Sequence, residues 1–246
     1  MRVELTEVGD DVIAVRGPDV NWTLLRDGRS FTLVDAGYPG YRAAVRDSIR
    51  HAGLDLAGLE AIVVTHAHID HIGGVPGLLE HRTVPVYVGA PEVAMAVGDR
   101  TESAGPLDVA KRLWKPRFVP WSVRITAAGG AGHVTVPDSI GVPDSTVLDI
   151  PGQPTVVLTP GHTSGHLCLL TGGALLTGDA LITGHAITGR KGPQLAAAFF
   201  HTDARQAARA LDRIATVDAS AIVPGHGPVW QGTARDAVSI ARGIAA

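Results

Sequence analysis

The residues that most restrict the fold are those at 66–71, directly after the apolar run AIVVT at 61–65. Four groups that bind metals through nitrogen or oxygen lie within six residues there: His66, His68, Asp70 and His71. The apolar run is typical of a strand buried on both faces, so the four groups lie on a strand-to-helix turn, and His66 and His68 can leave the chain on the same side. Crowding such groups together without a cation is costly, so the segment predicts a metal site at the rim of a sheet.

Strand-like segments occur in both halves of the chain. Short alternating runs fill residues 1–35, and helical spacing follows at 41–52. A helix is expected over about 70–80 and a strand over 84–88. In the second half, strands are expected at 146–150, 155–159, 166–171, 174–177 and 219–223, with helices at 203–215 and 233–244. Two β-rich halves of similar content predict two packed sheets with helices on their outer faces.

Residues 90–145 are the least regular part of the chain. Short helices are expected near 91–98 and 106–113, followed by a loop rich in Gly, Pro and Trp. No low-complexity linker divides the 246 residues, so a single domain over 1–246 is predicted, with 90–145 as a pocket or lid region.

The composition is that of a globular protein with an excess of imidazole. Eleven histidines accompany a single cysteine, Cys168, which excludes a disulfide framework and a thiolate metal cluster. The formal charge of −3 gives no electrostatic reason to expect nucleic acid or an anionic membrane as a partner. No signal peptide or membrane span is apparent, so a cytoplasmic protein acting on a small molecule is expected; the composition specifies no oligomeric state.

Three further candidate ligands follow apolar runs in short Gly/Pro turns. His162 lies in Thr-Pro-Gly-His, Asp179 in Thr-Gly-Asp-Ala and His226 in Val-Pro-Gly-His. Such turns can hold a ligand rigidly at the edge of a sheet. Imidazole and carboxylate groups favour Zn²⁺, Fe or Mn over metals that prefer soft ligands.

With these motifs in this order, the chain resembles the metallo-β-lactamase superfamily over most of its length. The resemblance rests on Asp35-Ala-Gly37, the HxHxDH stretch at 66–71, His162, Asp179 and His226. It implies an α+β fold, the four-layer αββα sandwich, with the site at one edge between the sheets. It also implies that one metal is bound by His66, His68 and His162, that a second is bound by Asp70, His71 and His226, and that Asp179 bridges them.

Two divalent ions, most simply Zn with Mn or Fe as alternatives, can share a hydroxide and polarise a substrate oxygen. Asp70 is the expected catalytic residue, since it could orient that hydroxide or accept its proton. The leading hypothesis is therefore a dinuclear metal-dependent hydrolase that uses a metal-bridging hydroxide on a small ester, lactone, thioester or amide.

Two differences from known relatives indicate which branch of the family the chain resembles. Asp179 replaces the cysteine ligand of many true β-lactamases, whereas the complete ligand set resembles the glyoxalase II and lactonase branch. Only 20 residues follow His226, so the helical domain with which glyoxalase II binds glutathione thioesters is not expected, and neither is the inserted domain of the nuclease members.

Two other functions stay open on the sequence. Some relatives are mononuclear-iron sulfur (persulfide) dioxygenases that use the equivalents of His66, His162 and Asp179. A non-catalytic binding module is the third interpretation, although such members usually lose ligands.

Several other residues could support the site. Asp35 and Thr65 could orient metal-binding imidazoles, or could simply belong to a turn and a strand end. His166 is expected to be a structural histidine beneath the site. Trp114, Trp121, His185 and His201 are candidates for the substrate pocket; the alternatives are core packing for the tryptophans and solvent-exposed loops for the histidines.

Overall fold

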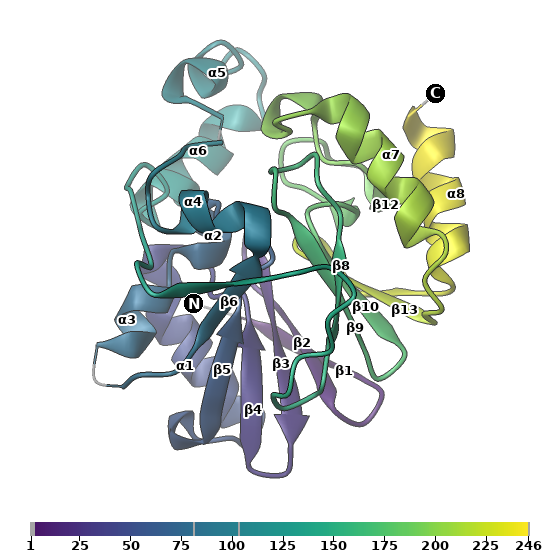
Figure 1. The fold of residues 1–246 in the computed structure, drawn as a ribbon. Helices are drawn as coiled ribbons and strands as arrows, with labels where there is room; N and C mark the ends of the chain where they lie inside the picture. Colours follow the sequence, from purple (N-terminus) through teal and green to yellow (C-terminus); the bar gives the residue numbers. More distant parts are fainter. Residues whose placement is uncertain (1–2, 81, 103, 246) are drawn as a thin grey trace.

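The computed structural model describes residues 3–80, 82–102 and 104–245, and it shows two β-sheets face to face with helices on their outer sides (Figure 1). The first sheet has the strand order β1-β2-β3-β4-β5-β6-β7. These strands are β1 Glu4–Val8, β2 Val12–Arg16, β3 Asn21–Asp27, β4 Ser30–Val34, β5 Leu59–Val63, β6 Val86–Gly89 and β7 Ser139–Val142. The first four pair antiparallel, and β4 to β7 pair parallel.

The second sheet has the order β14-β13-β10-β9-β8, and a separate two-stranded sheet pairs β11 with β12. These strands are β8 Thr155–Leu158, β9 Leu167–Thr171, β10 Ala174–Gly178, β11 Ile182–Gly184, β12 Lys191–Gln194, β13 Ala221–Pro224 and β14 Trp230–Gln231. β10 and β13 run parallel, so their carboxyl ends lie at the same edge of the sheet.

The α-helices are α1 Arg42–His51, α2 Ile69–Ile72, α3 Val75–Leu79, α4 Val93–Ala96, α5 Pro106–Ala110, α6 Phe118–Ala127, α7 Ala204–Ile214 and α8 Ala234–Ala245. Figure 1 shows α1 and α3 beside the first sheet, α7 and α8 beside the second, and α5 and α6 at the upper left, above α4 and α2. None of the helices in the described ranges has the length and apolar character that crossing a membrane requires.

Three hydrophobic clusters separate four layers, which confirms the predicted αββα sandwich. Strand alternation decides which cluster each residue joins, because successive side chains point to opposite faces. In β2, Ile13 packs toward the helices of the first sheet, whereas Val12 packs between the sheets with Leu169 and Val223. In β9, Cys168 faces α7 and α8 and packs with Leu211.

The expected helix over 70–80 is instead two short helices, α2 and α3, interrupted at Gly73 and Gly74. A Cβ atom on Gly74 would overlap the carbonyl oxygen of Ala36, and one on Gly73 would lie 2.5 Å from Cδ of Pro39. The segment after β4 therefore passes too close for a side chain at either glycine, and the two glycines fix how the residues after β5 turn.

The region 90–145 is more ordered than the sequence predicted. The loop expected after residue 113 contains α6, with Phe118 and Trp121 on its buried face. Pro120 is compatible with this helix because it lies in the first turn, where no intrahelical N–H bond is required. The strand expected at 146–150 is wrong: only an isolated bridge joins Val147 to Thr155, because turns on both sides limit the pairing.

Candidate metal centre

The predicted metal ligands lie on four turns at one edge of the two sheets. His66, His68, Asp70 and His71 follow β5 in the first sheet, whereas the other three follow strands of the second sheet. His162 lies in the β8–β9 turn, Asp179 directly after β10 and His226 after β13. The seven side chains form overlapping groups of three, and within each group the ligand atoms lie within 4.8 Å of one another.

The first group consists of His66, His68 and His162. Nε2 of His162 lies 3.0 Å from Nδ1 of His68. The ring centroid of His66 lies 4.6 Å from that of each of the other two. Their Nε2 and Nδ1 atoms therefore converge on one position, as the ligands of a single cation do.

The second group consists of Asp70, His71 and His226. Oδ2 of Asp70 lies 3.8 Å from Nε2 of His71 and 3.4 Å from Nε2 of His226. Asp179 contacts both groups: Oδ1 lies 3.6 Å from Nε2 of His71, and Oδ2 lies 3.5 Å from Nε2 of His162 and 3.3 Å from Nε2 of His226. This position between the groups is the one expected of a bridging carboxylate.

The chemistry of these donors fits bound divalent cations. His66 Nε2, His71 Nε2 and Asp179 Oδ1 are buried, and none of them has a hydrogen-bond partner among the described residues. Leaving a buried polar atom unpaired costs on the order of 1–3 kcal/mol. Three such atoms directed into one cluster of imidazoles and carboxylates indicate that a cation supplies the missing partner.

The second ring nitrogen of three ligands donates a hydrogen bond away from the cluster. His71 Nδ1 lies 2.7 Å from Oδ2 of Asp35, His226 Nδ1 lies 2.6 Å from the carbonyl oxygen of Asp19, and His68 Nε2 lies 2.6 Å from the carbonyl oxygen of Glu102. Because these oxygens can only accept, the facing nitrogens carry the protons. The opposite nitrogen of each ring keeps its lone pair for a metal.

Asp35 and Thr65, which the sequence offered as supporting residues, are hydrogen-bonded to each other and to two of the candidate ligands. Asp35 accepts hydrogen bonds from the backbone N–H of Thr65 at 2.8 Å and from its hydroxyl at 2.9 Å. The Thr65 oxygen, having donated its proton, can accept one from Nδ1 of His66 at 3.1 Å. Asp35 therefore orients His71 directly and His66 through Thr65. Its φ of +59° lies in the left-handed region, where Asp and Asn are among the tolerated side chains.

His166, expected from the sequence to be a structural histidine, lies against the cluster, with its ring centroid 5.1 Å from that of His66. Its Nδ1 is 2.8 Å from the Thr159 hydroxyl, and its Nε2 accepts a hydrogen bond from the backbone N–H of Asp179 at 3.1 Å. Burial lowers the pKa of His166 to about 3, so the ring is neutral and available as this acceptor. The contact fixes the turn that presents Asp179.

Glu92 is a supporting residue that the sequence motifs did not predict. This fully buried side chain accepts hydrogen bonds from the backbone N–H of Ala67 at 2.8 Å, the hydroxyl of Thr163 at 2.8 Å and the N–H of Gly165 at 2.9 Å. It thereby joins the turn that carries His66 and His68 to the turn that carries His162. A lone acid within the apolar stretch APEVAMAV was the available signal.

Of the four predicted pocket residues, Trp121, His185 and His201 lie near the candidate ligands, whereas Trp114 does not. The buried Trp121 ring lies 5.8 Å from that of His185, which in turn lies 4.8 Å from the His226 ring. His201 contacts His162 directly. Trp114 does not join them: it is 79% exposed, and its ring lies near Lys115 on the outside of the α5–α6 segment.

Electrostatics distinguish two pairs of imidazoles among the candidate ligands in the metal-free protein. Burial, reinforced by neighbouring imidazoles, holds the pKa of His66 and His162 well below 6.5. Burial also opposes the charged form of His71, but Asp35, Asp70 and Asp179 outweigh it and raise the pKa of His71 to about 9. The same balance raises the pKa of His226, with Asp179 as the largest opposing charge. The carboxylates therefore stabilise protons where a second cation would bind.

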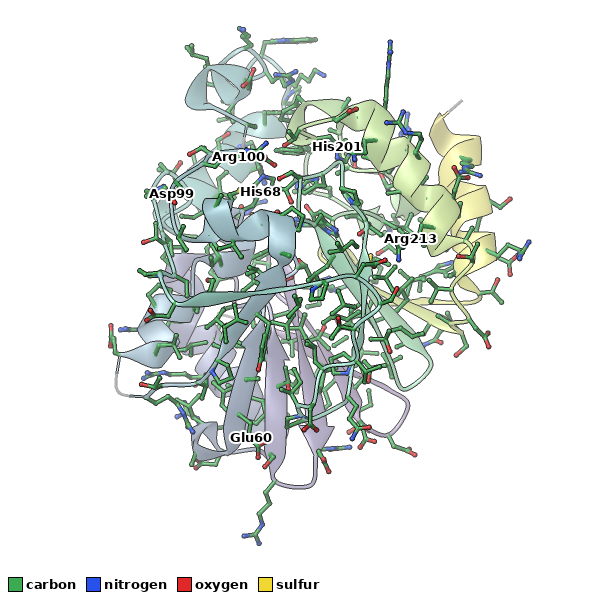
Figure 2. The ribbon with its side chains drawn as sticks, in the orientation of Figure 1. Glu60, His68, Asp99, Arg100, His201 and Arg213 are labelled. Carbon is green, nitrogen blue, oxygen red and sulfur yellow. The ribbon has the colours of Figure 1, made fainter. Side chains whose placement is uncertain are left out.

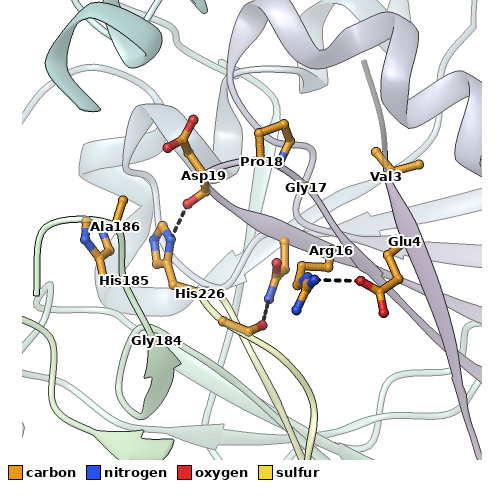
Figure 3. A pocket seen from close by; sticks show the side chains of 12 residues that line it. Val3, Glu4, Arg16, Gly17, Pro18, Asp19, Gly184, His185, Ala186 and His226 are labelled. Carbon is orange, nitrogen blue, oxygen red and sulfur yellow. Dashed lines mark hydrogen bonds and ion pairs between the residues drawn. The ribbon is translucent and has the colours of Figure 1, made fainter. Parts of the chain in front are cut away.

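A cavity of about 730 Å³ opens beside His226 and His185 (Figure 3). Asp19 and the Arg16–Glu4 ion pair, with 2.6 Å between Nη2 and Oε2, form other parts of its wall. Its volume is in the range of small-molecule sites. Figure 3 shows His226 and Asp19 on the wall of this cavity, joined by the hydrogen bond from Nδ1 of His226 to the carbonyl oxygen of Asp19.

Comparison with known proteins agrees with this geometry. The family model described as metallo-β-lactamase superfamily matches residues 15–226. "Probable metallo-hydrolase YflN" of Bacillus subtilis (strain 168) is 32% identical over 213 residues, which cover 80% of this chain and 75% of that protein. A hydroxyacylglutathione hydrolase of Alkalilimnicola ehrlichii is 33% identical over 165 residues, which cover 67% of this chain but only 48% of that longer protein.

Solved structures show the same fold at lower sequence identity. The metallo-β-lactamase SMB-1 bound to 2-mercaptoethanesulfonate superposes with a TM-score of 0.67 at 16% identity, covering 97% of this chain and 93% of the other. A metallo-β-lactamase family protein from Thermus thermophilus gives 0.60 at 24% identity, covering 93% and 76%. From the family match, the fold and the relatives together, the chain belongs to the metallo-β-lactamase superfamily, among its metallo-hydrolases.

Proposed function

We propose that this protein is a dinuclear metal-dependent hydrolase of a small ester, lactone, thioester or amide. The observation that carries the proposal is the convergence of seven donor groups with Asp179 in contact with both halves. His66, His68 and His162 would hold one cation, and Asp70, His71 and His226 the other. Bound divalent ions would supply Lewis acidity and a water of lowered pKa.

Asp70 is the residue best suited to proton transfer. Its side chain is 17% exposed, against 8% for Asp179, so it is the ligand carboxylate that a water molecule reaches more readily. Oδ2 of Asp70 faces His71 and His226. Oδ1 is therefore the oxygen that can orient an attacking water and accept its proton.

The substrate class rests on the cavity and on two relatives. A cavity of about 730 Å³ beside His226 can hold a small molecule. The aligned relatives include a metallo-hydrolase and a hydroxyacylglutathione hydrolase. Since the aligned residues cover only 48% of the latter, we propose hydrolysis of an acyl bond for this chain and not the substrate named for that relative.

Elemental analysis and a substrate panel test the proposal. Protein purified without added metal should contain about two equivalents of Zn, Mn or Fe and should hydrolyse members of an ester, lactone and thioester panel. His226→Ala and Asp179→Ala should lose metal and reduce kcat/KM by at least about 100-fold, whereas His133→Ala, on an exposed loop, should not. Full turnover after confirmed metal loss would contradict the two-metal proposal.

The same elemental analysis, combined with a measurement of oxygen consumption, tests the dioxygenase alternative. That alternative needs only His66, His162 and Asp179. One ferrous iron per chain with oxygen consumption on a glutathione persulfide would favour that alternative. Zinc without oxygen uptake would exclude it.

A further inference from the structure

His162 differs from the other metal-binding imidazoles in the partner of its second nitrogen. The partner is an oxygen for His66, His68, His71 and His226. For His162 it is another imidazole: Nδ1 of His162 lies 3.1 Å from Nδ1 of His201, with the rings nearly perpendicular at 84°. Figure 2 labels His201 near His68 at the edge where the sheets meet.

The surroundings of His201 assign the protons of both rings. Nε2 of His201 lies 3.1 Å from the carbonyl oxygen of Ala196, which can only accept, so this nitrogen carries the proton. In a neutral His201 ring, Nδ1 then has a lone pair and must accept. Nδ1 of His162 is therefore the donor, and Nε2 of His162 keeps its lone pair toward His68 and Asp179.

The backbone holds His201 against the turn of His162. The N–H of Thr202 donates to the carbonyl oxygen of His162 at 3.0 Å, and that of Asp203 donates to the carbonyl oxygen of Gly161 at 2.9 Å. Asp203 also caps α7 by accepting from the N–H groups of Arg205 and Gln206. These backbone hydrogen bonds therefore hold the segment that carries His201 beside the turn that carries His162.

The segment that carries His201 also reaches the aromatic residues near the cavity. The ring of Phe200 lies 6.0 Å from that of Trp121 and 5.5 Å from that of His185. Phe200 directly precedes His201 in the chain. A displacement of Phe200 would therefore also move the imidazole that faces His162.

We infer that His201 is a positioning residue that fixes the proton and ring orientation of His162 for the first metal. The inference rests on the proposed metal site. It assigns to a histidine outside the ligand set the role that Asp35 has toward His71. Partners of this kind typically change metal affinity by about 10- to 100-fold when removed.

A pair of substitutions separates this role from general packing. Asparagine bears its carbonyl oxygen on Cγ, the atom to which histidine Nδ1 is bonded, so His201→Asn keeps the acceptor that faces His162. His201→Gln places its amide near the Nε2 position instead and loses that acceptor. Matched His133→Asn and His133→Gln variants control for histidine loss on an exposed loop.

The measurement is the affinity for Zn²⁺ by competition with a chromophoric chelator, together with the visible spectrum after Co²⁺ loading. We expect His201→Gln and His201→Ala to bind one of the two equivalents about 10- to 100-fold more weakly and to alter the Co²⁺ spectrum, with His201→Asn within about threefold of the unsubstituted protein. Melting of each metal-free variant by circular dichroism verifies folding.

The inference would be overturned if His201→Gln or His201→Ala bound both equivalents of Zn²⁺ equally tightly. It would also be overturned if His201→Asn and His201→Gln weakened Zn²⁺ binding equally. Hydrolysis is not part of the readout. Metal binding that follows the expected pattern without turnover of any substrate would therefore contradict the proposed function and leave the role of His201 supported.

Discussion

At the scale of single residues, the metal centre depends on partners that bind no metal themselves. Asp35 serves two ligands at once, because its Oδ2 accepts from Nδ1 of His71 and from the Thr65 hydroxyl that faces His66. Glu92 and His166 fix the backbone of the turns that carry the other ligands. These hydrogen-bond partners therefore determine where the lone pairs of the candidate ligands point.

Asp35→Asn should weaken metal binding by about 10- to 100-fold while keeping the fold. Asparagine tolerates the φ of +59° at this position but removes the negative charge that stabilises the Nδ1 proton of His71. Chelator competition measures the affinity, and far-ultraviolet circular dichroism verifies the fold. Unchanged affinity for both metals would show that the Asp35–His71 contact is dispensable.

The pKa of His71 predicts a pH dependence for the metal-free protein. Its value is about 9 in the fold, because Asp35, Asp70 and Asp179 outweigh the effect of burial, against 6.5 for an unperturbed histidine. A raised pKa stabilises the folded state fully below pH 6.5, and this contribution is lost as the pH rises through 9. The melting temperature of chelator-treated protein should therefore fall between pH 6.5 and 9.

Metal affinity should change in the opposite direction over the same window, since the second cation must displace the His71 proton. Competition titrations at pH 6.5, 7.5 and 8.5 should show tighter binding of the second equivalent at each step. A flat affinity and a flat melting temperature across this range would contradict the charge state assigned to His71.

At the scale of elements, close approaches between turns fix the ligand positions. The turn after β13 reaches the turn after β10, where the N–H of Gly225 donates to the carbonyl oxygen of Gly178 at 2.8 Å. A Cβ atom on Gly225 would overlap Oδ1 of Asp179 and lie 2.9 Å from Cε1 of His71. Only glycine leaves room there for the Asp179 carboxylate.

Gly225→Ala should displace Asp179, reduce the metal content and destabilise the protein by roughly 1–3 kcal/mol, the usual range for overpacking. Gly243→Ala is the matched control, because a Cβ atom on this helical glycine meets nothing within 4 Å. That control should be neutral or stabilising by up to about 1 kcal/mol. Elemental analysis and urea unfolding measure both effects, and a fully loaded Gly225→Ala protein would contradict this account.

At the scale of the whole molecule, the candidate metal ligands come from both sheets. Ligands from β5 and α2 belong to the first sheet and its helices, and those after β8, β10 and β13 belong to the second. A bound ion would therefore stabilise the contact between halves that are far apart in the sequence.

Removing metal should lower the melting temperature. At a free concentration 1,000 times its dissociation constant, one ion stabilises the folded state by about 4 kcal/mol, which corresponds to roughly 8–16 °C for a chain of this size. Differential scanning calorimetry with and without a chelator measures the shift, and returning Zn²⁺ should restore it. An unchanged transition would contradict a structural contribution from the cations.

The sequence determined the layers of the fold and the identity of the clustered donors. Period-two alternation in strands such as β2 assigns each side chain to one face, and this local property survives folding because the backbone geometry imposes it. The turn residues Gly161, Gly178 and Gly225 indicated the strand ends at which His162, Asp179 and His226 lie. Helix α6 and the loss of a strand at 146–150 were not predicted, since packing and turn geometry outweighed local composition there.

Only the tertiary structure decided which residues support the donors. Glu92 lies 25 positions from Ala67 and 71 from Thr163, and His201 lies 39 from His162, so no local pattern relates them. Hydrogen bonds between such residues depend on distances of about 3 Å and on which nitrogen carries a proton. The packing of the strands sets these distances and the partners that decide which nitrogen carries the proton. The sequence therefore specified a metal cluster, and the fold specified how each ligand is held.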